Sequence, residues 1–99
     1  MPKIAMSRLN SILDSIIERC EPLLEDGKWF RVCVRPNKNG TPRIDIIPRN
    51  SISPKDIYGD NEFIVVLDDR DLILYRKGVL TRKDLTQLVK EALLGLGLS

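Results

Sequence analysis

Arginine residues and one tryptophan gather in a short stretch of the sequence. Residues 27–55 hold seven basic residues but only one acidic residue, Asp45. Arg31 and Arg35 stand four positions apart in Trp-Phe-Arg-Val-Cys-Val-Arg, where the apolar residues follow a period of two that is typical of a strand. Since residues i, i+2 and i+4 of a strand share a face, both guanidinium groups are expected to emerge on one side. Guanidinium groups in a row can contact successive phosphates.

This basic segment predicts a nucleic-acid-binding surface on a protein that is not an enzyme. A two-stranded ribbon fits the major groove of DNA, and an exposed tryptophan can stack on an unpaired base. The expected partner is therefore DNA or RNA. The residues expected to contact it are Trp29, Arg31, Arg35, Lys38, Arg43 and Arg49.

Two other interpretations of the same residues stay open. Edge strands often carry charge and proline simply to prevent pairing with other sheets, and Trp29 could cover one end of the core. The chain could instead be a protein-interaction module or a homodimer that uses the hairpin edge or the C-terminal leucines. Leu94 and Leu98 exceed what one narrow helical stripe requires, which makes them the candidate interface residues.

The sequence has no histidine, which excludes Ser-His-Asp and Cys-His catalysis and the usual histidine ligands of zinc. The two cysteines, Cys20 and Cys33, form no metal-binding motif. Asp68, Asp69 and Asp71 are the candidate metal cluster, but neighbouring side chains in a tight turn splay apart, so we interpret them as a solvated hairpin turn. No glycine-rich phosphate loop is present. We therefore predict no cofactor and no bound metal.

Two amphipathic helices are expected near the ends of the chain, each from apolar residues at helical spacing. Ser7 is the expected N-cap of the first helix, and Pro22 is expected to end or kink it near Cys20 or to open a short further turn over residues 23–26. Thr81 and Asp84 resemble a capping box for the second helix. The two stripes are Leu9, Ile12, Leu13, Ile16, Ile17 and Cys20, and Leu85, Leu88, Val89, Ala92, Leu93 and Leu96.

Four strands are expected between the helices. The first, residues 29–35, turns at Asn39-Gly40 into a return strand at residues 43–47. Residues 63–67 and 72–75 are apolar on both faces and are expected at the sheet centre or under cover. The sequence thus predicts an α+β fold of order α-β-β-β-β-α, with a four-stranded antiparallel sheet and both helices on one face. By alternation, the open face would carry Trp29, Arg31, Cys33, Arg35, Arg43 and Asp45.

A chain of 99 residues fits a single domain, residues 1–99. The first residues lack the apolar core of a signal peptide, and no run approaches the ~20 apolar residues of a membrane helix. These features predict a soluble, cytoplasmic protein with no membrane partner. The scarcity of Gln and His beside abundant charged residues hints at thermostability.

Overall fold

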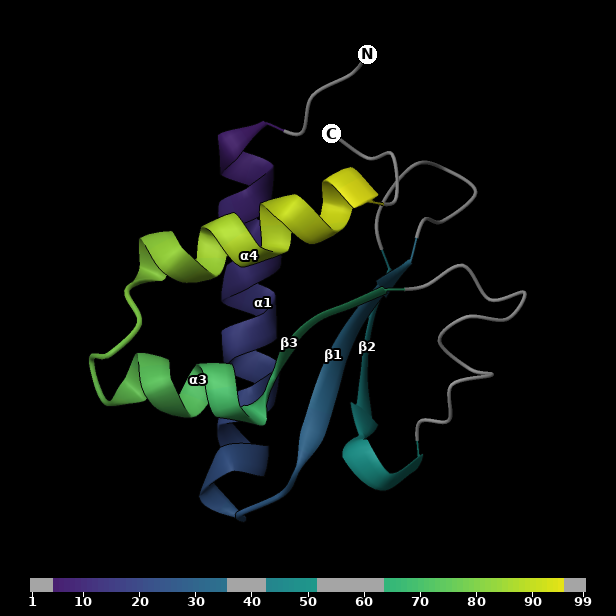
Figure 1. Cartoon of the computed structure of the whole chain (residues 1–99), viewed down its shortest axis with the longest axis vertical. Helices are drawn as coiled ribbons and strands as arrows, with labels where there is room; N and C mark the ends of the chain where they lie inside the picture. The colour runs from purple at the N-terminus through teal and green to yellow at the C-terminus, as the bar shows by residue number, and fades with distance from the viewer. Residues whose placement is uncertain (1–4, 36–42, 52–63, 96–99) are drawn as a thin grey trace.

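The computed structural model describes residues 5–35, 43–51 and 64–95. These ranges form an α+β fold with three α-helices and three strands (Figure 1). The elements are α1 (Met6–Glu25), β1 (Phe30–Arg35), β2 (Arg43–Pro48), the 3-10 turn η1 (Arg49–Ser51), β3 (Ile64–Asp68), α3 (Asp69–Arg76) and α4 (Arg82–Gly95). The predicted α+β class is confirmed, whereas the predicted order α-β-β-β-β-α and the four-stranded sheet are wrong.

The sheet is antiparallel with the order β2-β1-β3, so the first predicted strand lies at its centre. Val32 of β1 stands opposite Ile46 of β2 and Leu67 of β3. β2 lies at an edge, as its flanking prolines indicated. β3 was expected at the sheet centre or under cover; it forms the other edge, and α4 packs against it. Cover by α4 accounts for the apolar residues on the core-facing side of β3.

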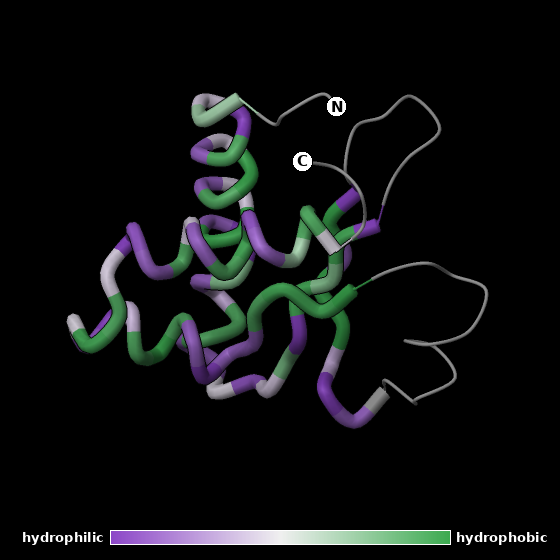
Figure 2. Tube along the Cα trace, turned by 45° about the horizontal axis from the view of Figure 1, so that its top comes forward, coloured by the Kyte–Doolittle hydropathy of each residue, from purple (hydrophilic) through white to green (hydrophobic). Residues whose placement is uncertain are grey.

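One face of the sheet and the three helices enclose a single apolar core. Phe30, Val32 and Val34 alternate along β1 and are buried in it. Both predicted helical stripes supply the other side, since the residues that the two helices bury completely or nearly so are Leu9, Ile12, Leu13, Ile16, Cys20, Leu85, Val89, Ala92 and Leu93. α4 crosses in front of α1 (Figure 1), and each turn of α1 carries both apolar and polar residues (Figure 2). The helical periodicity was therefore a sound guide to the core.

Residues 72–75, predicted as a strand, belong to helix α3. The Asp68 carboxylate accepts hydrogen bonds from the backbone N–H groups of Arg70 (2.9 Å) and Asp71 (3.2 Å). The Asp71 carboxylate accepts from the backbone N–H of Asp68 (3.0 Å), which completes a capping box. The acidic stretch interpreted as a hairpin turn is thus a helix N-terminus, where negative charge is favourable.

Helix α1 does not end near Cys20 but continues through Pro22 to Glu25. Proline inside a helix costs about 3 kcal/mol, because it removes a hydrogen bond and crowds the preceding turn. Leu23 and Leu24 pack against the core in the last turn, and this burial offsets the cost. The N-cap is Ala5, which makes no side-chain cap, so the predicted cap at Ser7 is also wrong.

Helices α1 and α3 end in the same backbone motif. Gly27 and Gly78 have φ angles of 67° and 80°, the left-handed region that glycine adopts freely. After α1, the Lys28 N–H donates to Leu23 C=O (2.9 Å), and after α3 the Val79 N–H donates to Leu74 C=O (2.9 Å). Bonds of this 6→1 type define the Schellman motif. The first of these turns sends the chain directly into β1.

Helix α4 begins with the predicted capping box. The Thr81 hydroxyl accepts from the Asp84 N–H (3.2 Å), and the Asp84 carboxylate accepts from the Thr81 N–H (2.8 Å). These bonds to Thr81 lower the pKa of Asp84.

The predicted turn at Asn39-Gly40 lies outside the described residues. Within the described ranges, no helix has the length and apolar character needed to cross a membrane.

Asp68→Ala removes the side chain that accepts two hydrogen bonds at the start of α3. We expect it to lower the free energy of unfolding by about 1 kcal/mol, measured by urea denaturation. Asp68→Asn is the matched control, because asparagine is an equally good N-cap and should retain most of the stability. Equal stability of the alanine and asparagine variants would contradict the cap.

Candidate nucleic-acid interface

The face of the sheet turned away from the helices brings the predicted arginines together. Residues directly opposite each other in an antiparallel pair point to the same face. Val32 and Val34 point into the core, so the residues between and beside them point the other way. The opposed pairs on this side, called the outer face below, are Arg31 with Ile47, Cys33 with Asp45, and Arg35 with Arg43.

Asp45 holds two of these arginines at once. Its Oδ2 lies 3.5 Å from Nε of Arg35, and its Oδ1 lies 3.2 Å from Nε of Arg43. Each contact uses Nε, so the terminal Nη groups of both arginines are not the atoms that Asp45 binds. The Arg43 side chain is 57% exposed and the Arg35 side chain 30% exposed. The result is a pair of oriented guanidinium groups sharing one carboxylate, with a net charge of +1.

Arg31 adds a further positive charge to the outer face. It is half-buried on the central strand, opposite Asp68 of β3. The Asp68 carboxylate is already used as the cap of α3. No ion pair joins Arg31 to another residue in the part of the chain that the structure describes.

Cys33 was expected to face solvent, but only 1% of its surface is exposed. It points to the outer face, where its opposite residues on the flanking strands are Asp45 and Val65. Burial, with a smaller effect from Asp45, raises the pKa of the Cys33 thiol to about 11. Burial raises the pKa of Cys20 in the core to about 11 as well. Neither thiol supplies a reactive thiolate near neutral pH.

At one end of this face, the buried carboxylate of Asp69 accepts hydrogen bonds from two other segments of the chain. It is 2% exposed, and its Oδ1 accepts a hydrogen bond from the Phe30 N–H (3.3 Å). The Phe30 N–H points toward β3, which has already ended at Asp68, so Asp69 takes the place of a missing strand partner. Its Oδ2 accepts from Nη2 of Arg49 at 3.2 Å.

Arg49 is consequently engaged inside the fold. Its side chain is 19% exposed, and its guanidinium carbon lies 5.1 Å from the centroid of the Trp29 ring. The backbone N–H of Arg49 donates to the Trp29 C=O (3.1 Å), which continues the β1–β2 pairing by one step. Nε of Arg49 is buried and has no hydrogen-bond partner. Of the predicted phosphate-binding residues, Arg49 is the one whose charge is taken up by a buried acid.

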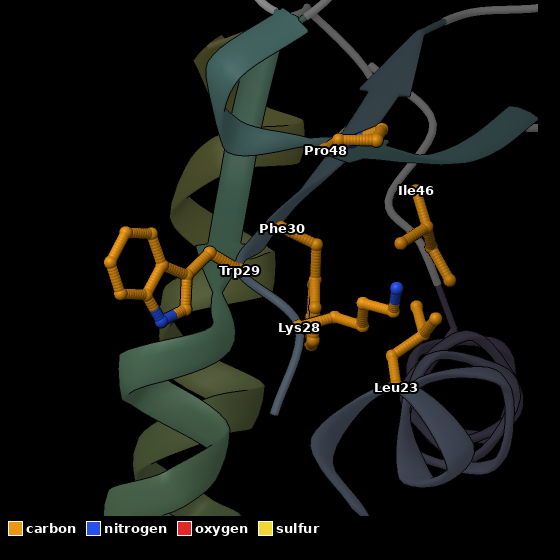
Figure 3. A pocket seen from close by; sticks show the side chains of 6 residues that line it. All are labelled: Leu23, Lys28, Trp29, Phe30, Ile46 and Pro48. Atoms are coloured by element: carbon orange, nitrogen blue, oxygen red, sulfur yellow. The ribbon is translucent and has the colours of Figure 1, made fainter. Parts of the chain in front are cut away.

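Trp29 itself is 71% exposed at the start of β1. A hollow of about 260 Å³ lies beside it, and Lys28 extends over this hollow toward Ile46 and Leu23, while the indole ring points away from it (Figure 3). A second hollow of about 440 Å³ adjoins Lys28, Trp29 and Asn50. The Lys28 side chain and the Trp29 ring thus leave the backbone in different directions at this end of the sheet.

The outer edge of β2 is partly blocked. Nη1 of Arg19 donates to the Ile44 C=O (3.1 Å), and Pro48 has no N–H to offer. Because backbone groups alternate along a strand, Ile46 between them directs both its N–H and its C=O to this edge. An added strand would find few partners there.

Two predicted residues, Lys38 and Leu98, lie outside the described residues, and Leu94 is 47% exposed on α4. Among the side chains that the structure describes, no three metal-binding groups converge.

Sequence reasoning missed Asp69, which was grouped with a solvated turn. Its one signal was its place directly after an apolar strand, at the first turn of a capped helix.

No protein-family model, curated protein or solved structure matches this chain at a significant level. The candidate site therefore depends on its own geometry.

Asp69→Ala leaves the Phe30 N–H and the Arg49 guanidinium without their acceptor. We expect it to lower the free energy of unfolding by about 3 kcal/mol, because breaking a buried ion pair strands the remaining charge. Urea denaturation of Asp69→Ala, Arg49→Ala and the double variant measures the coupling. The double variant should be less destabilised than the sum of the two single changes. Simple additivity would show that the two groups do not interact.

Proposed function

We propose that this protein binds nucleic acid without catalysing a reaction, and that the outer face contacts the phosphates through Arg31, Arg35 and Arg43. The observation that carries the proposal is the shared carboxylate of Asp45, which holds Arg35 and Arg43 side by side through their Nε atoms. Nη groups positioned in this way can each donate to a phosphate oxygen.

Charge supports the same proposal. The outer face carries three guanidinium groups against two carboxylates, Asp45 and Asp68, which leaves a net charge of +1. Ordering a free arginine on binding costs about 0.5–1.5 kcal/mol, and the ion pairs to Asp45 have already restricted two of the side chains. The carboxylate thus reduces the total charge but lowers the entropic cost of using it.

Spacing is suitable for an extended polyanion. Arg31 and Arg35 are four residues apart on β1, which corresponds to about 13 Å along the strand. Arg43 stands opposite Arg35 on β2, so it widens the charged strip at that end. A phosphate backbone lying along β1 would meet positive charge at both ends of the strand.

Binding should weaken steeply with salt. If three phosphates are neutralised, a slope of 0.7–0.9 per contact predicts a loss of affinity of roughly 20- to 40-fold between 50 and 200 mM salt. The triple variant Arg31→Gln, Arg35→Gln, Arg43→Gln should lose most of the affinity and most of the salt dependence. Fluorescence anisotropy of a labelled oligonucleotide measures both quantities.

The matched control removes three charges elsewhere. Arg76, Lys83 and Lys90 are exposed on α3 and α4, and changing all three to Gln alters the net charge by the same amount. This control should reduce affinity much less than the outer-face variant. Equal losses in the two variants would indicate general attraction to the net charge rather than a site, and no binding at low salt would remove the proposal.

A protein-interaction role is the second candidate, and the exposure of Leu94 favours it. The blocked edge of β2 makes the hairpin edge a poor interface, so the candidate contact is helix α4. In that case light scattering should find a dimer, and Leu94→Asp should convert it to a monomer because a carboxylate cannot be buried cheaply at an interface. Val79→Asp, the same kind of change at an exposed apolar residue outside α4, is the control. A monomer at all concentrations would contradict this role.

A further inference from the structure

We infer that the nucleic acid bound here is single-stranded and that an unpaired base stacks on the indole of Trp29. This inference rests on the proposed function and names the class of ligand that the same site would take. Trp29 stands two residues before Arg31 on the same side of the strand, about 7 Å along β1. A chain whose phosphate meets Arg31 would bring a neighbouring base to the ring.

The exposure of Trp29 is the first reason. A tryptophan that only completed a core would be largely covered, whereas 71% of Trp29 is exposed. The contact with Arg49 does not explain this exposure, because a cation–π contact at an exposed position contributes little.

The second reason is that the ring is supported from one side only. Arg49 lies over one face of the indole at 5.1 Å and is itself fixed by the buried Asp69. A ring held on one face by a fixed guanidinium presents its other face to solvent. That is the arrangement of a stacking platform, in which the protein supplies one layer and the ligand supplies the next.

A duplex cannot use this platform in the same way. Inside a double helix both faces of each base are covered by neighbouring bases, so no face is available to the indole without unpairing. The arginines would still attract duplex phosphates. The inference therefore predicts a difference between single strands and duplexes that charge alone does not produce.

Trp29 is the only tryptophan in the chain, so its fluorescence reports directly on stacking. The experiment titrates the full chain at low salt with a single-stranded oligothymidine, a duplex of equal length, and an abasic oligomer with the same number of phosphates. We expect the oligothymidine to quench the fluorescence and to bind roughly ten- to hundredfold more tightly than the abasic oligomer. The duplex should bind with little quenching.

Variants at Trp29 test the same point by anisotropy of the labelled ligands. Trp29→Ala should weaken oligothymidine binding roughly ten- to hundredfold and leave binding of the abasic oligomer unchanged. Trp29→Phe keeps an aromatic face and should retain most of the affinity. The fluorescence comparison on the unmodified protein stands even if a variant fails to fold.

The outcomes separate the two proposals. Binding of all three ligands with equal affinity and no quenching would overturn the stacking inference and leave the phosphate-binding function in place. Binding of none of them would overturn both. Equal affinity of the unmodified protein and a folded Trp29→Ala variant for oligothymidine would also overturn the inference.

Discussion

The geometry of the candidate site depends on one buried carboxylate. Asp69 connects the first residue of β1 and the turn after β2 to the start of α3, at the point where the β1–β3 pairing has ended. A buried charge is tolerated only where it is paired and hydrogen-bonded, and here one oxygen accepts from the backbone and the other from Arg49. Since Arg49 in turn lies over Trp29, Asp69 also sets the position of the guanidinium group that faces the indole.

Two acids in this fold have opposite effects on the basic residues around them. Asp69 forms a largely buried ion pair with Arg49, and this pair joins the turn after β2 to the start of α3. Asp45 stays half-exposed and binds two arginines by their inner nitrogens, which leaves their outer nitrogens directed elsewhere. Counting charges along the sequence treats these arginines alike. Each arginine can donate to a ligand only through the guanidinium nitrogens that the protein's own carboxylates do not bind.

Much of the architecture could be predicted from periodicity. The stripes of α1 and α4 and the alternation of β1 and β2 were long enough to distinguish helix from strand, and alternation also placed the arginines on a common face. Residues 72–75 failed because four apolar residues fit either period. The Asp68–Asp71 capping pattern would have decided for a helix, as the similar Thr81–Asp84 pattern did. Pro22 misled because the burial of Leu23 and Leu24 outweighed its local cost.

The parts of the site that could not be predicted are those made by distant residues. Asp69 meets Arg49 across 20 positions and Phe30 across 39 positions of the sequence. No local pattern reports such a contact, because it exists only once the sheet and α3 have packed. The burial of Cys33 could not be predicted for a similar reason, because its opposite residues, Asp45 and Val65, belong to two other strands.

The guarded edge of β2 bears on behaviour at high local concentration. Where many copies of a protein are crowded together, exposed strand edges can pair between copies and lead to fibrils. With Arg19 covering the Ile44 carbonyl and Pro48 lacking a donor, the row of hydrogen-bonding groups along this edge is interrupted on both sides of Ile46. An interrupted row disfavours pairing between copies.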